Sequence, residues 1–125
     1  MSGTMSTRIL KTEKDVVKRF FKLLQSKDLS DFPNIFERDA VVSEPFSQAR
    51  YLRGQSEIKP FLKIALSATG NMQHRIMLEE LQGQGNKLSA FVSFDRTEDG
   101  LKGQFTFELD PESKKIRKLE IQFMH

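Results

Sequence analysis

The hydrophobic period of the chain changes near Thr69–Gly70, and this change constrains the fold more than any other feature. Before this point, apolar residues recur every three to four positions, as they do on one face of an α-helix. After it, apolar and polar residues alternate, as they do in strands of a sheet that is covered on one face. Helices followed by a run of strands predict an α+β fold. With 125 residues, of which 38% are hydrophobic, the chain suits one domain with a single core.

Three helices and one short strand are expected in the first half of the chain. The first helix is expected to begin at Thr12, whose hydroxyl can cap it, and to end near 26–28. The other expected segments are a short helix over Ser30–Phe36, a strand over Ala40–Ser43, a loop over Phe46–Gly54 and a helix that begins at Ser56. Residues 1–11 show no periodicity, and we expect them to be disordered or a remnant of cloning. The single domain is therefore expected to span residues 12–125.

The second half of the chain predicts an antiparallel sheet. Its alternating segments are separated by the turn sequences GQGN, TEDG and DPESK. The predicted strands are Met72–Leu81, Lys87–Arg96, Lys102–Leu109 and Lys115–Met124. Because alternation places the apolar residues on one side, the face of the sheet that meets the helices should be continuously apolar.

Composition and charge exclude several classes of protein. Without cysteine, the chain cannot form disulfides or thiolate metal sites. No apolar run is long enough for a membrane span or a signal-peptide core, so we expect a cytoplasmic protein with no membrane partner. The net charge of +3 comes from basic residues interleaved with acidic ones, which predicts no nucleic-acid partner. Because no phosphate loop, nucleophile elbow or metal motif is present, we expect neither a metal nor a cofactor.

Glu44 is the strongest candidate for a functional side chain. Alternation places it on the same face of its strand as Ala40 and Val42, and the proline after it holds its backbone extended. A carboxyl group at the end of an apolar strand face would be desolvated, as general acids and bases often are. The alternative is a solvated glutamate at a fraying strand end, paired with Arg50 or Arg53.

The two histidines are further candidates. His125 continues the strand face of Ile121 and Phe123 and could lie at the mouth of a cavity, but a solvated terminal residue is the alternative. His74 shares its parity with Ile76 and could also face the cavity. The alternative to a functional role is a half-buried histidine with satisfied hydrogen bonds. Neither histidine has a carboxylate at ligand spacing beside it, so no zinc site is expected.

Phenylalanine supplies eleven of the twelve aromatic residues, and the twelfth is Tyr51. Because phenylalanine carries no polar group, these rings should line an interior. They either line a ligand pocket or fill the core beneath it. The residues expected in these roles are Phe20, Phe61, Val92, Phe94, Phe105, Phe107, Ile121 and Phe123.

The order of these segments resembles the NTF2-like superfamily, and within it the SnoaL-like and ketosteroid-isomerase-like proteins. The resemblance covers Thr12 to Phe123 and rests on the segments VVKRFFKLLQSKDLSDFPNIFERDAVVSEP, LRGQSEIKPFL and FTFELDPESKKIRKLEI. It implies a cystatin-like α+β cone, in which a strongly curved antiparallel sheet wraps three N-terminal helices around an apolar pocket. It also implies a homodimer that pairs through the sheet.

The resemblance also indicates which positions would carry chemistry. Glu44 occupies the position at which ketosteroid isomerases have their carboxylate base, immediately before a proline at the end of the first strand. These enzymes also use a tyrosine and a protonated aspartate as hydrogen-bond donors to an oxyanion. The matching positions here are Phe20 and Phe105, neither of which can donate a hydrogen bond. Because the loss of one such donor costs about 2.7–4 kcal/mol of transition-state stabilisation, steroid isomerisation by that mechanism is not expected.

Two functions from different classes stay open. In the first, the cone binds a small, mostly apolar molecule with Glu44 as its polar anchor. An enzyme of this kind would be a cofactor-independent isomerase, cyclase or lyase, in which Glu44 removes a proton from a carbon acid with help from His125 or His74.

In the second, the pocket is vestigial, the protein is not an enzyme, and the other face of the sheet mediates dimerisation or partner binding. That face is expected to carry Ser89, Phe91, Ser93, Thr106 and Glu108. Phe91 favours this function, because a large aromatic ring on a polar strand face suggests a covered surface.

Overall fold

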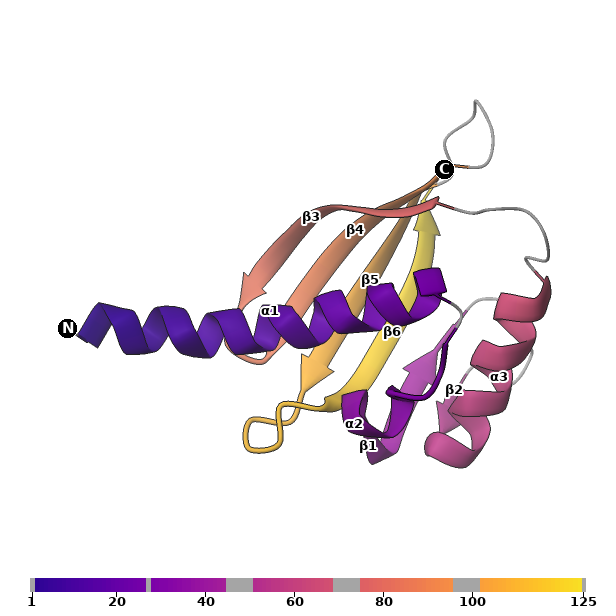
Figure 1. The fold of residues 1–125 in the computed structure, drawn as a ribbon, viewed down its shortest axis with the longest axis horizontal. Coiled ribbons are helices and arrows are strands. Elements are labelled where there is room, and N and C mark those ends of the chain that lie inside the picture. The colour runs from indigo at the N-terminus through magenta and orange to yellow at the C-terminus, as the bar shows by residue number, and fades with distance from the viewer. Residues whose placement is uncertain (1, 27, 45–50, 69–74, 96–101, 125) are drawn as a thin grey trace.

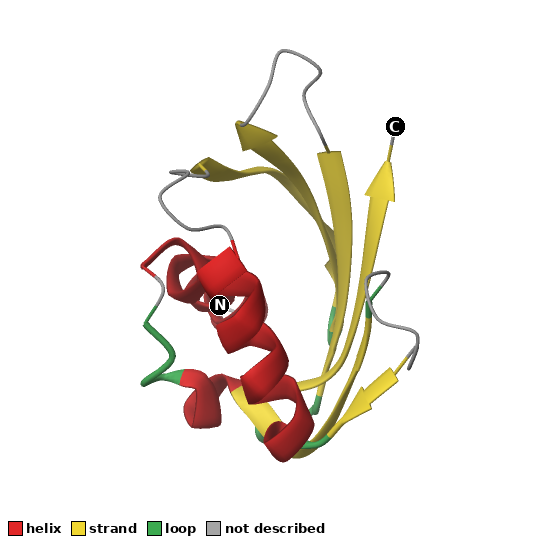
Figure 2. Ribbon diagram, turned by 90° about the vertical axis from the view of Figure 1, so that its right-hand side faces the viewer, coloured by secondary structure: helices red, strands yellow, loops and turns green. Residues whose placement is uncertain are grey.

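A six-stranded sheet curves around three helices, which all lie on its concave side (Figure 2). The computed structural model describes the chain over residues 2–26, 28–44, 51–68, 75–95 and 102–124. Its side chains are described over residues 13–26, 28–44, 51–64, 78–93 and 102–123. The predicted α+β architecture is confirmed.

Helix α1 (Ser2–Ser26) crosses the concave face of the sheet, and its N-terminal end extends beyond the sheet in Figure 1. The helix begins earlier than predicted, so Thr12 lies inside it and not at its N-cap. Residues 2–11 contain no proline and a single glycine, Gly3, so no strong helix breaker stops the helix from continuing past Thr12. One face of α1 is buried against the sheet through Val16, Val17, Phe20, Phe21, Leu23 and Leu24.

Helix α3 (Gln55–Ala68) begins immediately after Gly54, one residue before the predicted start at Ser56. Gly54 has a φ of +79°, a conformation that side chains disfavour and glycine accepts. Its carbonyl oxygen accepts hydrogen bonds from the backbone N–H groups of Glu57 and Ile58, at 3.1 and 3.0 Å. Gly54 therefore ends the preceding strand and caps α3.

The sheet has the strand order β2-β1-β6-β5-β4-β3. Its strands are β1 (Phe36–Ser43), β2 (Tyr51–Arg53), β3 (Arg75–Gln84), β4 (Lys87–Asp95), β5 (Lys102–Leu109) and β6 (Ile116–Met124). β1 and β6 run parallel, whereas the other neighbouring strands are antiparallel, so the expectation of an entirely antiparallel sheet is wrong at this pair. These two strands are far apart in sequence, so no tight turn forces them to run in opposite directions.

The β1 end of the sheet differs most from the prediction. Helix α2 (Phe32–Ile35) is shorter than expected, and Phe36, with φ −103° and ψ 142°, already begins β1. The segment expected to be a loop contains the edge strand β2, in which Arg53 lies opposite Val41. β1 and β2 together extend the sheet beyond β6.

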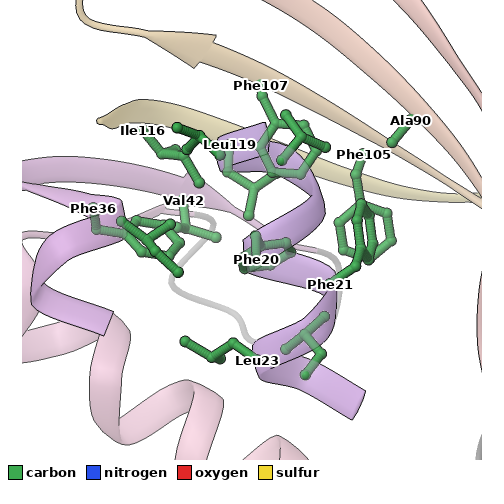
Figure 3. Packing of buried hydrophobic residues seen from close by; sticks show 14 of the residues in the cluster. Phe20, Phe21, Leu23, Phe36, Val42, Ala90, Phe105, Phe107, Ile116 and Leu119 are labelled. Carbon is green, nitrogen blue, oxygen red and sulfur yellow. The ribbon is translucent and has the colours of Figure 1, made fainter. Parts of the chain in front are cut away.

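The core lies between the helices and the concave face. At its centre is a phenyl cluster, which we define as Phe20, Phe21, Phe36, Phe105 and Phe107. The centroid of the Phe20 ring is 5.3 Å from that of Phe21, 5.8 Å from Phe36 and 5.4 Å from Phe107, all edge to face (Figure 3). Such pairs contribute about 0.5–1.5 kcal/mol beyond the burial of their surface. The cluster therefore fixes α1 against the sheet.

Candidate functional site

Glu44 is buried at the end of β1. Glu44 is 4% exposed, and Ala40 and Val42, which precede it on the same face, are 0% and 1% exposed. The alternation predicted from the sequence is therefore confirmed, and a fully solvated Glu44 is excluded. Among the residues that the structure describes, Glu44 and Glu13 are the two buried charged residues.

The register of the sheet places Glu44 at the end of an apolar row. Val42 lies opposite Leu119 on β6, so the next inward position of β1, Glu44, adjoins Ile121. Ile121 lies opposite Phe105 on β5, which belongs to the phenyl cluster. A carboxyl group at this place therefore meets hydrocarbon on the sheet side.

Phe20 and Phe105 lie together, one on α1 and the other on β5. Their ring centroids are 6.2 Å apart and both side chains are buried. The structure thus brings together the two positions at which the resemblance predicts hydrogen-bond donors, and both positions hold phenyl rings. Since a phenyl ring has no N–H or O–H group, these two positions cannot form an oxyanion hole.

The other apolar residues expected at a ligand site fall into two groups. Val92 and Phe107 are fully buried and belong to the packed core. Phe61 of α3 and Phe123 of β6 are only partly buried and pack against this core. Ile121, at 9% exposed, also belongs to the core, so Phe61 and Phe123 are the described residues of this set that are only partly buried.

The structure does not describe the side chains of three expected site residues. The backbone of Phe94 lies in β4 opposite Ile76, but its side chain lies outside the described part of the structure. His74 and His125 lie outside the described residues altogether. The roles expected for them stay predictions.

Glu13 is a buried acid that the sequence analysis did not single out. Glu13 is 2% exposed. Its Oε2 atom lies 3.9 Å from Nζ of Lys114, and its Oε1 atom has no hydrogen-bond partner. Lys114 belongs to the β5–β6 turn, at the opposite end of the strands from Glu44. The helical spacing of Glu13 with Val17 and Phe20, both on the buried face, could have revealed its position.

No described helix covers the convex face of the sheet (Figure 2). The outward positions of β4 and β5 there include the polar residues Ser89, Thr106 and Glu108. Phe91 on β4 lies on this face opposite Gln104 and is half-buried. Within the described residues, no group of three or more acidic or histidine side chains is placed to hold a metal ion. No described helix is long and apolar enough to cross a membrane.

Solved structures share this arrangement of helices and strands. A SnoaL-like protein from Burkholderia thailandensis has a TM-score of 0.77 and 11% identity, over 92% of this chain and 97% of that one. An NTF2-like protein from Mesorhizobium loti has a TM-score of 0.73 and 15% identity, over 92% and 93%. A steroid delta-isomerase from Pseudomonas aeruginosa has a TM-score of 0.71 and 18% identity, over 91% and 80%.

The chain therefore has an NTF2-like fold, as the sequence predicted. No protein-family model and no curated protein matches its sequence. At such low identities the structural likeness shows the fold alone, because one fold hosts many activities.

Proposed function

We propose that the protein binds a small, mostly apolar molecule on the concave side of its sheet, with Glu44 as the polar anchor. The observation that supports this function is the burial of Glu44 at the end of an apolar row. Acidic residues are rarely buried, and desolvated carboxyl groups are frequent in binding and catalytic sites. The fold is shared with a steroid delta-isomerase, and steroids are mostly apolar molecules.

The neighbours of Glu44 favour a particular kind of ligand. Ile121 and Phe105 follow Glu44 along the row of the sheet, and Phe61 and Phe123 are partly exposed apolar residues that pack against the same core. Most of the ligand would therefore contact hydrocarbon. An ionised carboxylate accepts hydrogen bonds and cannot donate them, so the group facing Glu44 would be a hydrogen-bond donor or an acidic C–H group.

If the protein is an enzyme, the same arrangement supports a proton transfer as its reaction. The carboxylate of Glu44 would remove a proton from a carbon next to a carbonyl group, breaking the C–H bond and forming an O–H bond. The electron pair would move onto the carbonyl oxygen. Return of the proton to another carbon would complete an isomerisation. In a cyclisation, the carbanion would instead attack a second carbonyl group, and the proton held by Glu44 would pass to the alkoxide so formed. Phe20 and Phe105 cannot stabilise the oxyanion, so another group would have to do so.

Native mass spectrometry of the purified protein tests the binding function. We expect the wild-type protein to carry an apolar molecule and Glu44→Gln to lose it, since the amide keeps the size of the side chain and removes its charge. Glu13→Gln is the matched control, because it removes the charge of the other buried glutamate and should leave the molecule in place. An unliganded wild-type protein, or equal retention in both variants, would contradict the proposal. If a reaction is found, Glu44→Gln should abolish turnover and leave the fold intact.

A second function is supported by Phe91. We propose as the alternative that the convex face forms a homodimer or binds another protein, because a half-buried phenylalanine lies there among polar side chains. Phe91→Lys would place a charge in such an interface. Light scattering should show a wild-type dimer and a monomeric variant, and a wild-type monomer would contradict dimerisation.

A further inference from the structure

A groove on the convex face lies apart from Glu44. It joins a cavity of about 660 Å³, lined in part by Arg38 and Ser56, to one of about 370 Å³, lined in part by Tyr51 and Lys118. Asp39, Val41 and Arg53 line both cavities, so the two form one continuous depression. We call it the β1–β2 groove.

Irregular strand pairing directs charged side chains to this groove. Between the pairs Phe36–Ile116 and Val41–Lys118, β1 has residues 37–40 where β6 has only Arg117. Arg38 and Asp39 lie in this extra length of β1. The pairing of β6 with β5 also skips Arg117, so Arg117 and Lys118 are both exposed. Such bulges re-aim side chains and are frequent beside functional sites.

Two of the cations in the groove already have acidic partners. Nη2 of Arg117 lies 2.6 Å from Oε2 of Glu108. Nζ of Lys118 lies 3.8 Å from Oε1 of Glu120. These pairs neutralise one side of the groove.

Arg38 and Arg53 differ from Arg117 and Lys118 in having no described acidic partner. Their guanidinium groups have no ion-pair partner among the described residues. Glu57 is close to Arg53, but its Oε1 atom accepts a hydrogen bond from the backbone N–H at 2.8 Å. Asp39 is the acidic side chain of the groove that has no described ion pair. Four cations and two acids line the groove as a whole, so it has an excess of positive charge: Arg38, Arg53, Arg117 and Lys118 against Asp39 and Glu108.

The groove also has an apolar part. Val41 is half-buried and lies opposite Arg53 in the β1–β2 pair, on the convex face. Tyr51, the next position of β2 on this face, is 49% exposed. An aromatic ring and a branched side chain thus adjoin two free guanidinium groups, a combination suited to an organic anion.

We propose that the β1–β2 groove binds a small organic oxyanion, with its phosphate or carboxylate group at Arg38 and Arg53 and its apolar body over Val41 and Tyr51. The planar fork of arginine matches both kinds of anion. A small ligand fits better than a nucleic acid, because Asp39 interrupts the basic path that a phosphodiester backbone needs. The site is independent of the function proposed for Glu44.

Tyrosine fluorescence gives a direct test, because Tyr51 is the only tyrosine and the chain has no tryptophan. The protein is titrated with butyl phosphate and with pentanoate at constant ionic strength, and with butanol as the uncharged control. We expect a saturable change in emission with at least one of the two anions and none with butanol. The anion that binds more tightly identifies the ligand as a phosphate or a carboxylate. The backbone amide resonance of Gly54, which lines the groove, provides a second readout.

Arginine variants complete the test. Arg38→Gln and Arg53→Gln should each raise the midpoint of the titration about tenfold, the loss expected for one charge-assisted contact. Arg19→Gln is the matched control, because Arg19 is exposed in the helical layer, where it pairs with Asp31, and it should leave the midpoint unchanged. The proposal is overturned if neither readout saturates, or if Arg53→Gln and Arg19→Gln have the same midpoint.

Discussion

The rings of Phe20 and Phe105 lie 6.2 Å apart, centroid to centroid, with their planes inclined at 54°. Phe20 comes from α1 and Phe105 from β5, so this contact connects the helical layer to the centre of the sheet. Phe107, on the same face of β5, is 5.4 Å from Phe20 and adds a second connection. Stability and the apolar character of the concave side therefore depend on the same rings.

Phe20→Ala should lower the free energy of unfolding by about 3–5 kcal/mol, because the fully buried ring leaves a cavity that its neighbours fill only in part. Phe123→Ala should cost less, about 1–2 kcal/mol, because Phe123 is only partly buried. Urea unfolding of the two variants measures both values. Equal losses would show that Phe20 is not central to the core.

Gly83→Ala should destabilise the protein much more than Gly85→Ala. A Cβ atom at Gly83 would lie 2.2 Å from the carbonyl oxygen of Lys87, whereas one at Gly85 would meet nothing within 4 Å. Both glycines have positive φ, so both substitutions carry backbone strain of about 1 kcal/mol, and only Gly83→Ala adds a clash. Thermal unfolding compares the two, and a lower Tm for Gly85→Ala would contradict this expectation.

The contribution of Glu108 to stability should depend on pH. Nε and Nη2 of Arg117 donate hydrogen bonds to Oε2 of Glu108, at 3.1 and 2.6 Å, and lower the pKa of Glu108 below its ordinary value of 4.5. A carboxyl group whose pKa is lower in the folded state stabilises the fold above its unfolded pKa, and this contribution is lost as the pH falls through the folded pKa.

Glu108→Gln should therefore lower the free energy of unfolding near neutral pH, by less than about 1 kcal/mol, since water screens this partly exposed pair. The difference from the wild type should shrink as the pH is reduced below 4.5 and vanish below the folded pKa. Urea unfolding over a series of pH values measures it. A difference that stays constant with pH would show that the charge of Glu108 is not its cause.

Lys114→Asn should lower the free energy of unfolding by about 1–3 kcal/mol, because it leaves the buried carboxylate of Glu13 without a counter-charge. Asparagine tolerates the φ of 64° at this position, so the backbone of the turn should not change. In contrast, Glu13→Met should be neutral or stabilising, since it removes a buried charge whose Oε1 atom has no partner. Chemical unfolding of both variants measures the sign of each effect. A large loss of unfolding free energy in Glu13→Met would contradict the second prediction.

Alternation predicted the inner strands well, because each is long and bounded by turn residues. Lys102–Leu109 has the predicted bounds, and parity placed Glu44 on its buried face correctly. Strict alternation cannot describe β3, because Leu78 and Leu81 have opposite parity and both are apolar. A bulge between Leu78 and Glu80 lets both leucines pack against the core.

Features that depend on distant partners could not be predicted. The strand β2 has only three residues, too few to show a period, and it exists through its pairing with β1. The groove at Arg38 and Arg53 depends on the mismatch in length between β1 and β6, which becomes visible only when the two strands are paired. The burial of Glu13 depends on a turn far along the chain that supplies Lys114.

A crystal structure of the protein purified without added ligand tests most directly whether the concave side holds an apolar molecule at Glu44. We expect density for a non-protein molecule with one polar atom about 3 Å from the carboxylate of Glu44 and its remaining atoms against Phe61 and Ile121. Protein side chains that fill the space beside Glu44, or a carboxylate directed to bulk water, would contradict this account.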